Sequence, residues 1–197
     1  MTIQPQVQPA KRHTRAFLRQ FIKNPMATGA IIPSSTFLTQ SMFLGVQPEL
    51  VSCYVEYGPG SGSFTHEAVC RLPSLKRMVL FEINPFFMRL MGEHYPQAEV
   101  ALGPQSLVKP LHGEADLVIS GLPFTNIPFE VSIRTIDEIK AILKPGGSFR
   151  TFLYAHTFYL PKNIELRDYI RQSFQSHVTY RFVGRNVPPA VVIEASV

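Results

Sequence analysis

The sequence has only two cysteines and no apolar run long enough to span a bilayer. Cys53 and Cys70 could form at most one disulfide, and neither has a partner at metal-ligand spacing, so we expect reduced thiols in the core and no metal site. The first 30 residues also lack the continuous apolar segment of a secretory signal. These absences predict a cytoplasmic protein, either soluble or bound peripherally to the inner face of a membrane.

Acidic residues are missing from the N-terminal part of the chain. Residues 1–48 contain five Lys or Arg residues and no Asp or Glu, so they carry the whole net charge of +5 and residues 49–197 sum to zero. In 13–24, Phe17 and Phe21 share one helical face with two aliphatic residues, while the cations lie mostly opposite. We predict an interfacial helix that binds an anionic membrane surface. Packing of this helix on its own domain is the alternative.

Strand-like and helical patterns alternate along the rest of the chain. The apolar runs lie at 52–57, 77–83, 98–102, 115–120 and 147–155, and the helical patterns at 36–44, 63–72, 85–94, 131–143 and 163–175. Such alternation predicts an α/β fold with a mostly parallel sheet and helices on both faces. Two last runs, 177–184 and 190–196, have no helix between them and predict an antiparallel hairpin at one edge.

The stretch Val-Glu-Tyr-Gly-Pro-Gly-Ser-Gly-Ser-Phe at 55–64 is a glycine-rich loop between a strand and a helix. It lacks Gly-Lys-Ser/Thr, so it is not a P-loop. Glu56 precedes the first glycine by two residues; a carboxylate there would repel a pyrophosphate and favour an ammonium or sulfonium group. Glu82 ends the next strand, twenty residues after Gly62, where an acid can accept both hydroxyls of a ribose. The pattern predicts S-adenosylmethionine as the cofactor. A plain strand-to-helix turn and a nicotinamide site are the alternatives.

The region 52–155 resembles the class I methyltransferases through "VEYGPGSG", "FEIN", "ADLVISGLP" and "ILKPGG". The resemblance implies a Rossmann-like fold with seven strands and one antiparallel C-terminal strand. "FLRQFIKNPMATGAIIPSS", "SGLPFTNIP" and "RNVPPAVV" resemble the bacterial phospholipid N-methyltransferases over about residues 16–193. They imply stepwise N-methylation of phosphatidylethanolamine toward phosphatidylcholine at the membrane. We expect a disordered segment 1–12, N-terminal helices in 13–48, a methyltransferase domain in 49–197, and a monomer.

The candidate site residues follow from these motifs. For the cofactor they are Glu56, Tyr57, Gly58, Pro59, Gly60, Gly62, Glu82, Ile83, Asn84, Gln105, Ser106, Ser120, Gly121 and Leu122. Gln105 stands near the position where many class I enzymes have an acid for the adenine amine. For the acceptor they are Pro33, Ser34, Ser35, Pro123, Phe124 and Tyr180, and for catalysis Tyr159, His156 and Tyr154. The Tyr and His side chains could accept a proton from the amine or hold a methylated ammonium by cation–π contact.

Other acceptors are possible with the same cofactor site. The adenine dimethylases of ribosomal RNA carry Asn-Leu-Pro-Tyr or a similar motif where this chain has Gly121 and Phe124. Without the Asn acceptor, recognition of a base amine is poorly supported, and we expect no nucleic-acid partner. A small-molecule N- or O-methyltransferase and a non-catalytic binding module remain open.

Overall fold

The computed structural model describes residues 35–103, 108–175 and 177–197. Several predictions concern residues outside these ranges and stay predictions. They are the disordered segment predicted at 1–12, the interfacial helix predicted at 13–24, and the roles of Pro33, Ser34, Gln105 and Ser106.

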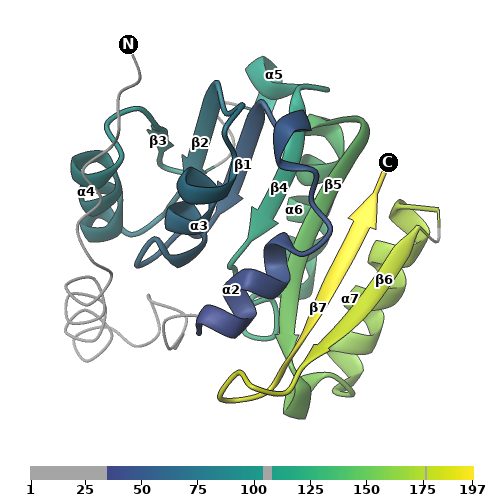
Figure 1. The fold of residues 1–197 in the computed structure, drawn as a ribbon. Helices are drawn as coiled ribbons and strands as arrows, with labels where there is room; N and C mark the ends of the chain where they lie inside the picture. Colours follow the sequence, from purple (N-terminus) through teal and green to yellow (C-terminus); the bar gives the residue numbers. More distant parts are fainter. Residues whose placement is uncertain (1–34, 104–107, 176) are drawn as a thin grey trace.

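Seven strands form one sheet in the order β3-β2-β1-β4-β5-β7-β6 (Figure 1). β7 is antiparallel to β5 and β6, and the other neighbouring strands pair in parallel. The predicted fold is therefore confirmed, including the hairpin at the edge. The strands are β1 Cys53–Tyr57, β2 Arg77–Phe81, β3 Glu99–Ala101, β4 Ala115–Ser120, β5 Leu143–Tyr154, β6 Val178–Val183 and β7 Ala190–Ser196.

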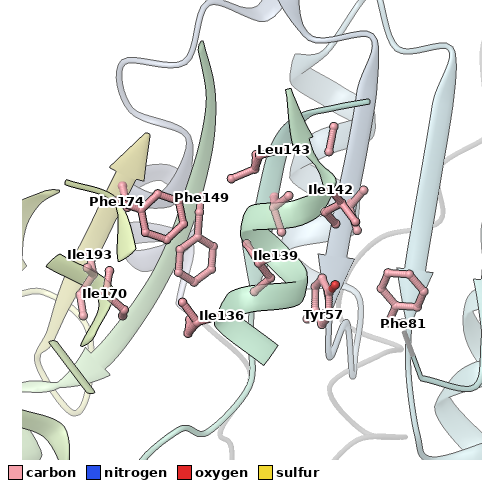
Figure 2. Close-up of a cluster of buried hydrophobic side chains, with 14 of the residues drawn as sticks. Tyr57, Phe81, Ile136, Ile139, Ile142, Leu143, Phe149, Ile170, Phe174 and Ile193 are labelled. Carbon is pink, nitrogen blue, oxygen red and sulfur yellow. The ribbon is translucent and has the colours of Figure 1, made fainter. Parts of the chain in front are cut away.

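Helices cover both faces of the sheet. The helices are α2 Thr36–Phe43, η1 Pro48–Leu50, α3 Ser63–Arg71, α4 Pro85–His94, α5 Val108–Leu111, α6 Phe129–Ile142, η3 Ala155–Thr157 and α7 Pro161–Ser173. Side chains of α5, α6 and α7 pack in one core cluster, part of which Figure 2 shows. Side chains of α2, α3 and α4 pack in the other. We call these two sides the α6–α7 face and the α2–α3 face.

The bounds of the other predicted elements agree with the structure to within two residues, and two details differ more. β5 begins at Leu143, four residues before the predicted run, because its pairing with β4 shifts register between Ala115 and Leu117, beside a Gly146 with φ +79°. Both cysteines are free, as predicted, but only Cys53 is buried. Cys70 lies exposed on α3, so the expectation of a second core thiol was wrong.

Two arginines hold the C-terminal end of α2 on the sheet. Arg150 of β5 is 1% exposed, and its Nη1 donates to the carbonyl oxygens of Met42 and Leu44 at 2.8 and 2.9 Å. Its Nη2 pairs with Glu194 of β7 at 2.9 Å. Arg181 of β6 donates to the Ser41 carbonyl oxygen at 2.8 Å. Because these donors satisfy carbonyls that a helix end leaves free, α2 is fixed across β5, β7 and β6.

Candidate functional site

The strand order reverses between β1 and β4, and these two strands pair directly. In open α/β sheets, ligands bind beyond the carboxyl ends of the strands at such a switch point. The glycine loop follows β1, and Gly121 follows β4, so two of the predicted motifs lie at this point (Figure 1). We call the end of the sheet where β1, β2, β4 and β5 finish the carboxyl edge.

The glycine loop has a backbone that other residues rarely adopt. Gly58, Gly60 and Gly62 have φ values of +71°, +53° and +83°. Gly58 N donates to the Phe81 carbonyl oxygen of β2 at 2.8 Å, and Gly62 N to that of Pro59 at 2.8 Å. The loop is therefore tied to the neighbouring strand and turns sharply into α3.

Gly121 approaches the glycine loop so closely that no side chain fits. Its N–H donates to the Tyr57 carbonyl oxygen at 2.8 Å, and a Cβ atom would lie 2.7 Å from the carbonyl oxygen of Gly58. Leu122 then packs on the other side of Gly58, whose own Cβ would lie 2.9 Å from Leu122 Cδ2. In this structure the contact leaves no room for the asparagine side chain that the adenine dimethylases carry at this position.

Glu56 is fully buried on the α2–α3 face. Its Oε2 accepts hydrogen bonds from the Tyr54 hydroxyl at 2.8 Å and from Thr65 Oγ1 at 2.7 Å. Its Oε1 has no partner within the described part of the chain. Burial raises the pKa of Glu56 to about 7, although the two hydrogen bonds oppose this shift. One oxygen of a buried carboxyl group is thus left for a donor that the described residues do not supply.

Glu82 connects the end of β2 to the glycine loop. Its Oε2 accepts from Gly60 N at 3.1 Å, and its Oε1 from the N–H groups of Ile83 and Asn84 at 2.8 and 2.9 Å. Burial raises its pKa, and the backbone donors offset part of that rise. Asn84 then caps α4 by accepting from Phe86 N at 3.0 Å. Each carboxylate oxygen has two lone pairs, so Oε2 keeps one acceptor position.

Two of the predicted residues lie on the other face of the sheet from Glu56. Tyr57 and Phe124 are 2% and 1% exposed and pack in the core cluster of the α6–α7 face, where Figure 2 shows Tyr57 beside Phe81. The prediction that Phe124 contacts the acceptor is therefore not carried forward. Ser120 is buried at the end of β4, and its Oγ accepts from Leu122 N at 3.3 Å, while Pro123 is half-buried.

Two motifs that are far apart in sequence meet at the carboxyl edge. Ser35 caps α2, and its Oγ also donates to Asn186 Oδ1 at 2.5 Å. Asn186 is 3% exposed and lies in the turn between β6 and β7. The same turn accepts a hydrogen bond from Ala155 N at the Pro189 carbonyl oxygen, 2.7 Å away. The end of β5, the start of α2 and this turn thus form one unit.

The predicted catalytic residues separate into two groups. Tyr154 stacks on His156 with ring centroids 5.9 Å apart, and on its other side it meets Phe152, which contacts Phe64 at the start of α3. These four rings form a row on the α2–α3 face, which we call the aromatic row. Tyr159 lies apart from them.

Tyr159 and Tyr180 belong to the opposite side of the sheet. Phe158 contacts both rings, at 5.3 and 5.9 Å, and packs against the core cluster of the α6–α7 face. Tyr180 also accepts from Arg171 Nη2 of α7 at 3.3 Å. The sequence could not separate these tyrosines, because they occur within similar mixtures of aromatic and polar residues.

Sequence reasoning missed Thr65, Asn186 and Phe152. Thr65 lies in the first turn of α3, and its contact with Glu56 depends on how the glycine loop turns. Asn186 stands within the quoted motif "RNVPP" but carried no role of its own. Within the described ranges, no three His, Cys, Asp or Glu residues could hold a metal ion together. The described helices are all too short or too polar to cross a membrane.

Comparison with known proteins identifies a relative over most of the chain. No model of a protein family matches the chain. Ornithine lipid N-methyltransferase of Singulisphaera acidiphila is 30% identical over 182 residues, which cover 88% of this chain and 91% of that protein.

Solved structures agree with the fold. A putative O-methyltransferase from Klebsiella pneumoniae superposes with a TM-score of 0.66 at 12% identity, covering 96% of this chain and 91% of that one. The 1,6-didemethyltoxoflavin-N1-methyltransferase of Burkholderia thailandensis, solved with S-adenosylhomocysteine bound, gives 0.63 at 16% identity, with 99% and 92% covered. From the fold and the relative together, the chain belongs to the family of ornithine lipid N-methyltransferase and is an S-adenosylmethionine-dependent methyltransferase of class I.

Proposed function

We propose that this protein transfers a methyl group to the amine of a membrane lipid headgroup. The observation that carries the proposal is the relative, which is similar over 88% of the chain and is an ornithine lipid N-methyltransferase. Ornithine lipid is therefore the first acceptor to test. Phosphatidylethanolamine is the second, because the terminal motifs resemble the phospholipid N-methyltransferases.

The residues at the carboxyl edge fit the cofactor. The unpartnered Oε1 of Glu56 is an acceptor for the ammonium group of a bound amino acid. The remaining acceptor position of Glu82 Oε2 suits a ribose hydroxyl, beside the backbone of Gly60. Gly58 and Gly121 have no side chains, which allows the ends of β1 and β4 to approach each other closely. We infer that these residues, with Ile83 and Asn84, hold S-adenosylmethionine.

When bound, the cofactor supplies a methyl group on a positively charged sulfur. The chain must then bring a neutral amine into line with that methyl group, at about 3–3.5 Å. Tyr154 ends β5, and His156 follows it in η3 with its ring stacked on that of Tyr154. We propose that the His156 imidazole receives the proton of the amine, directly or through water. Burial raises the pKa of Tyr154, so its hydroxyl stays protonated and can accept a hydrogen bond from the amine. The aromatic row can also hold a methylated ammonium by cation–π contact. Tyr159 is left out, because its ring lies with Phe158 and Arg167.

The test follows a labelled methyl group. Purified protein is incubated with S-adenosylmethionine labelled in the methyl group and, in separate reactions, with ornithine lipid, phosphatidylethanolamine, phosphoethanolamine or RNA, the lipids dispersed in detergent. We expect label in the lipid extract, with ornithine lipid as the better acceptor. Label found only in phosphoethanolamine or RNA would refute the proposal.

A binding variant checks the site. Glu82→Ala should weaken S-adenosylmethionine binding in calorimetry by about 1–3 kcal/mol, since charge-assisted hydrogen bonds are lost. Glu165→Ala, an exposed acid of α7, is the matched control and should bind as the wild type does. Wild-type affinity in a folded Glu82→Ala protein would remove Glu82 from the proposed site.

A further inference from the structure

Exposed apolar side chains gather along one margin of the protein. Three of them are among its most exposed large apolar residues: Val187 at 79%, Tyr159 at 78% and Phe182 at 66%. Leu160 and Tyr180 are exposed beside them. We call this surface the aromatic edge; it consists of Tyr159, Leu160, Tyr180, Phe182 and Val187. Exposed apolar groups that gather in this way mark a binding surface more often than single ones do.

Phe158 connects Tyr159 to the strand that carries Tyr180 and Phe182. Tyr159 contacts Phe158, which contacts Tyr180 of β6. Phe182 follows on the same strand two residues later, and its ring lies against the next turn, because a Cβ on Gly184 would be 3.0 Å from Phe182 Cε1. Val187 belongs to that turn. β6 is the last strand of the sheet, and because β7 is antiparallel to both β5 and β6, β6 runs toward the carboxyl edge as β5 does (Figure 1).

Charged side chains lie on the same segments as these apolar ones. The Arg167 guanidinium lies 3.9 Å from the centroid of the Phe158 ring, and Arg171 pairs with Asp168 at 3.0 Å. Arg185 lies beside the Phe37 ring of α2, at 5.4 Å. The five residues of the aromatic edge are themselves uncharged, so they offer apolar and aromatic contact.

The sequence before the described fold is strongly basic: residues 1–34 carry five cations and no acid. The described part of the chain begins at Ser35, whose Oγ donates to Asn186 Oδ1, and Asn186 is the residue between Arg185 and Val187. The proposed catalytic residues Tyr154 and His156 flank Ala155, whose N–H donates to the Pro189 carbonyl oxygen of the same turn.

We propose that the aromatic edge rests on an anionic lipid bilayer, with its side chains at the level of the headgroups. Tyrosine and other amphipathic aromatic residues favour that interface. In this arrangement, the basic segment supplies the electrostatic attraction and the aromatic edge the apolar contact. The turn that joins them then lies next to the headgroups from which the acceptor comes. The inference rests on the proposed function, because it assigns the surface on which that function meets its lipid.

The two contributions can be separated by vesicle co-sedimentation of the full chain. The vesicles contain phosphatidylcholine and phosphatidylglycerol. Phe182→Ser combined with Val187→Ser should lower the partition coefficient by about tenfold or more while leaving its dependence on salt unchanged. Arg15→Glu, Arg19→Glu and Lys23→Glu together should abolish binding to these vesicles at low salt.

A matched pair of substitutions serves as the control. Leu44 and Leu50 are 57% and 65% exposed, but they follow α2 and lie outside the aromatic edge. Changing both to serine should leave vesicle binding as in the wild type. All variants are checked by thermal melting, and each exposed change should shift Tm by no more than about 2 °C.

Three outcomes decide the matter. A Phe182→Ser, Val187→Ser protein that binds vesicles as the wild type does would refute the proposal. Size-exclusion chromatography gives a second way to refute it. If the wild type is a dimer, and the two substitutions dissociate this dimer without changing vesicle binding, the aromatic edge binds a second copy of the chain and not a bilayer. Methylation of detergent-dispersed lipid should persist in the double variant. If the wild type methylates no dispersed lipid, the proposed function is refuted. The effect of the two substitutions on vesicle binding still tests whether the aromatic edge binds the bilayer.

Discussion

Replacing Gly121 tests how closely the ends of β1 and β4 must meet. A Cβ atom at this position would lie 2.7 Å from the Gly58 carbonyl oxygen and 3.6 Å from Phe64 Cε2. Because the nearer neighbour is backbone, it can give way only if the glycine loop moves. We expect Gly121→Ala to lower the free energy of unfolding by about 1–3 kcal/mol, the usual cost of overpacking. For a chain of this length, Tm should fall by about 2–12 °C.

The same change should weaken cofactor binding, because the displaced loop carries the proposed cofactor contacts. Calorimetry with S-adenosylmethionine should show an affinity at least about tenfold lower, which corresponds to about 1.4 kcal/mol. Gly121→Asn, which introduces the adenine dimethylase residue, should be worse because the side chain is larger.

Gly92→Ala is the control for Gly121→Ala. It lies in α4 with nothing within 4 Å of its Cβ position, so alanine should keep or raise stability by up to about 1 kcal/mol. A Gly121→Ala protein with wild-type Tm and wild-type affinity would refute the reasoning.

Two further predictions concern buried charges. Burial raises the pKa of Glu56 from 4.5 to about 7. Between these two pH values the folded protein holds a proton on Glu56 that the unfolded chain has lost. The free energy of unfolding should therefore fall as the pH rises from 4.5 to about 7. Urea unfolding across that pH range should show that the free energy of unfolding changes less with pH in Glu56→Gln than in the wild type. Equal changes in the two proteins would contradict a raised pKa of Glu56. Arg150→Met should lower the free energy of unfolding in urea by about 3–5 kcal/mol. The change removes a donor from Glu194 and from the carbonyl oxygens of Met42 and Leu44 at the end of α2. The half-exposed Arg181→Met should cost less, and a reversed order would show that α2 is held in another way.

Much of the fold followed from local patterns. The strands at 115–120 and 190–196 and the helix at 85–94 occur with the predicted bounds, because a buried strand and an amphipathic helix repeat at different periods. The four-residue helix α5 had no such signal, since one turn is too short to show a period. The early start of β5 was missed because its register shift depends on pairing with β4.

The candidate site was predictable where chain direction alone decides the position. Parallel strands end at the same edge, so the glycine loop after β1 and Glu82 after β2 had to be neighbours, and Glu82 indeed accepts from Gly60 N. The sequence could not say that Glu56 would be bonded to Tyr54 and Thr65 with one oxygen left over.

The sequence by itself thus determined the order of elements, the glycine loop and the acid at the end of each of its first two strands. Tertiary structure alone decided that Ser35 would meet Asn186 across 151 positions, and that Phe124 would enter the core. It also put Tyr154 and Tyr159 on opposite faces of the sheet. The reason is that periodicity reports which face of an element is buried, whereas a residue beyond the end of a strand points where the loop and its distant partners direct it.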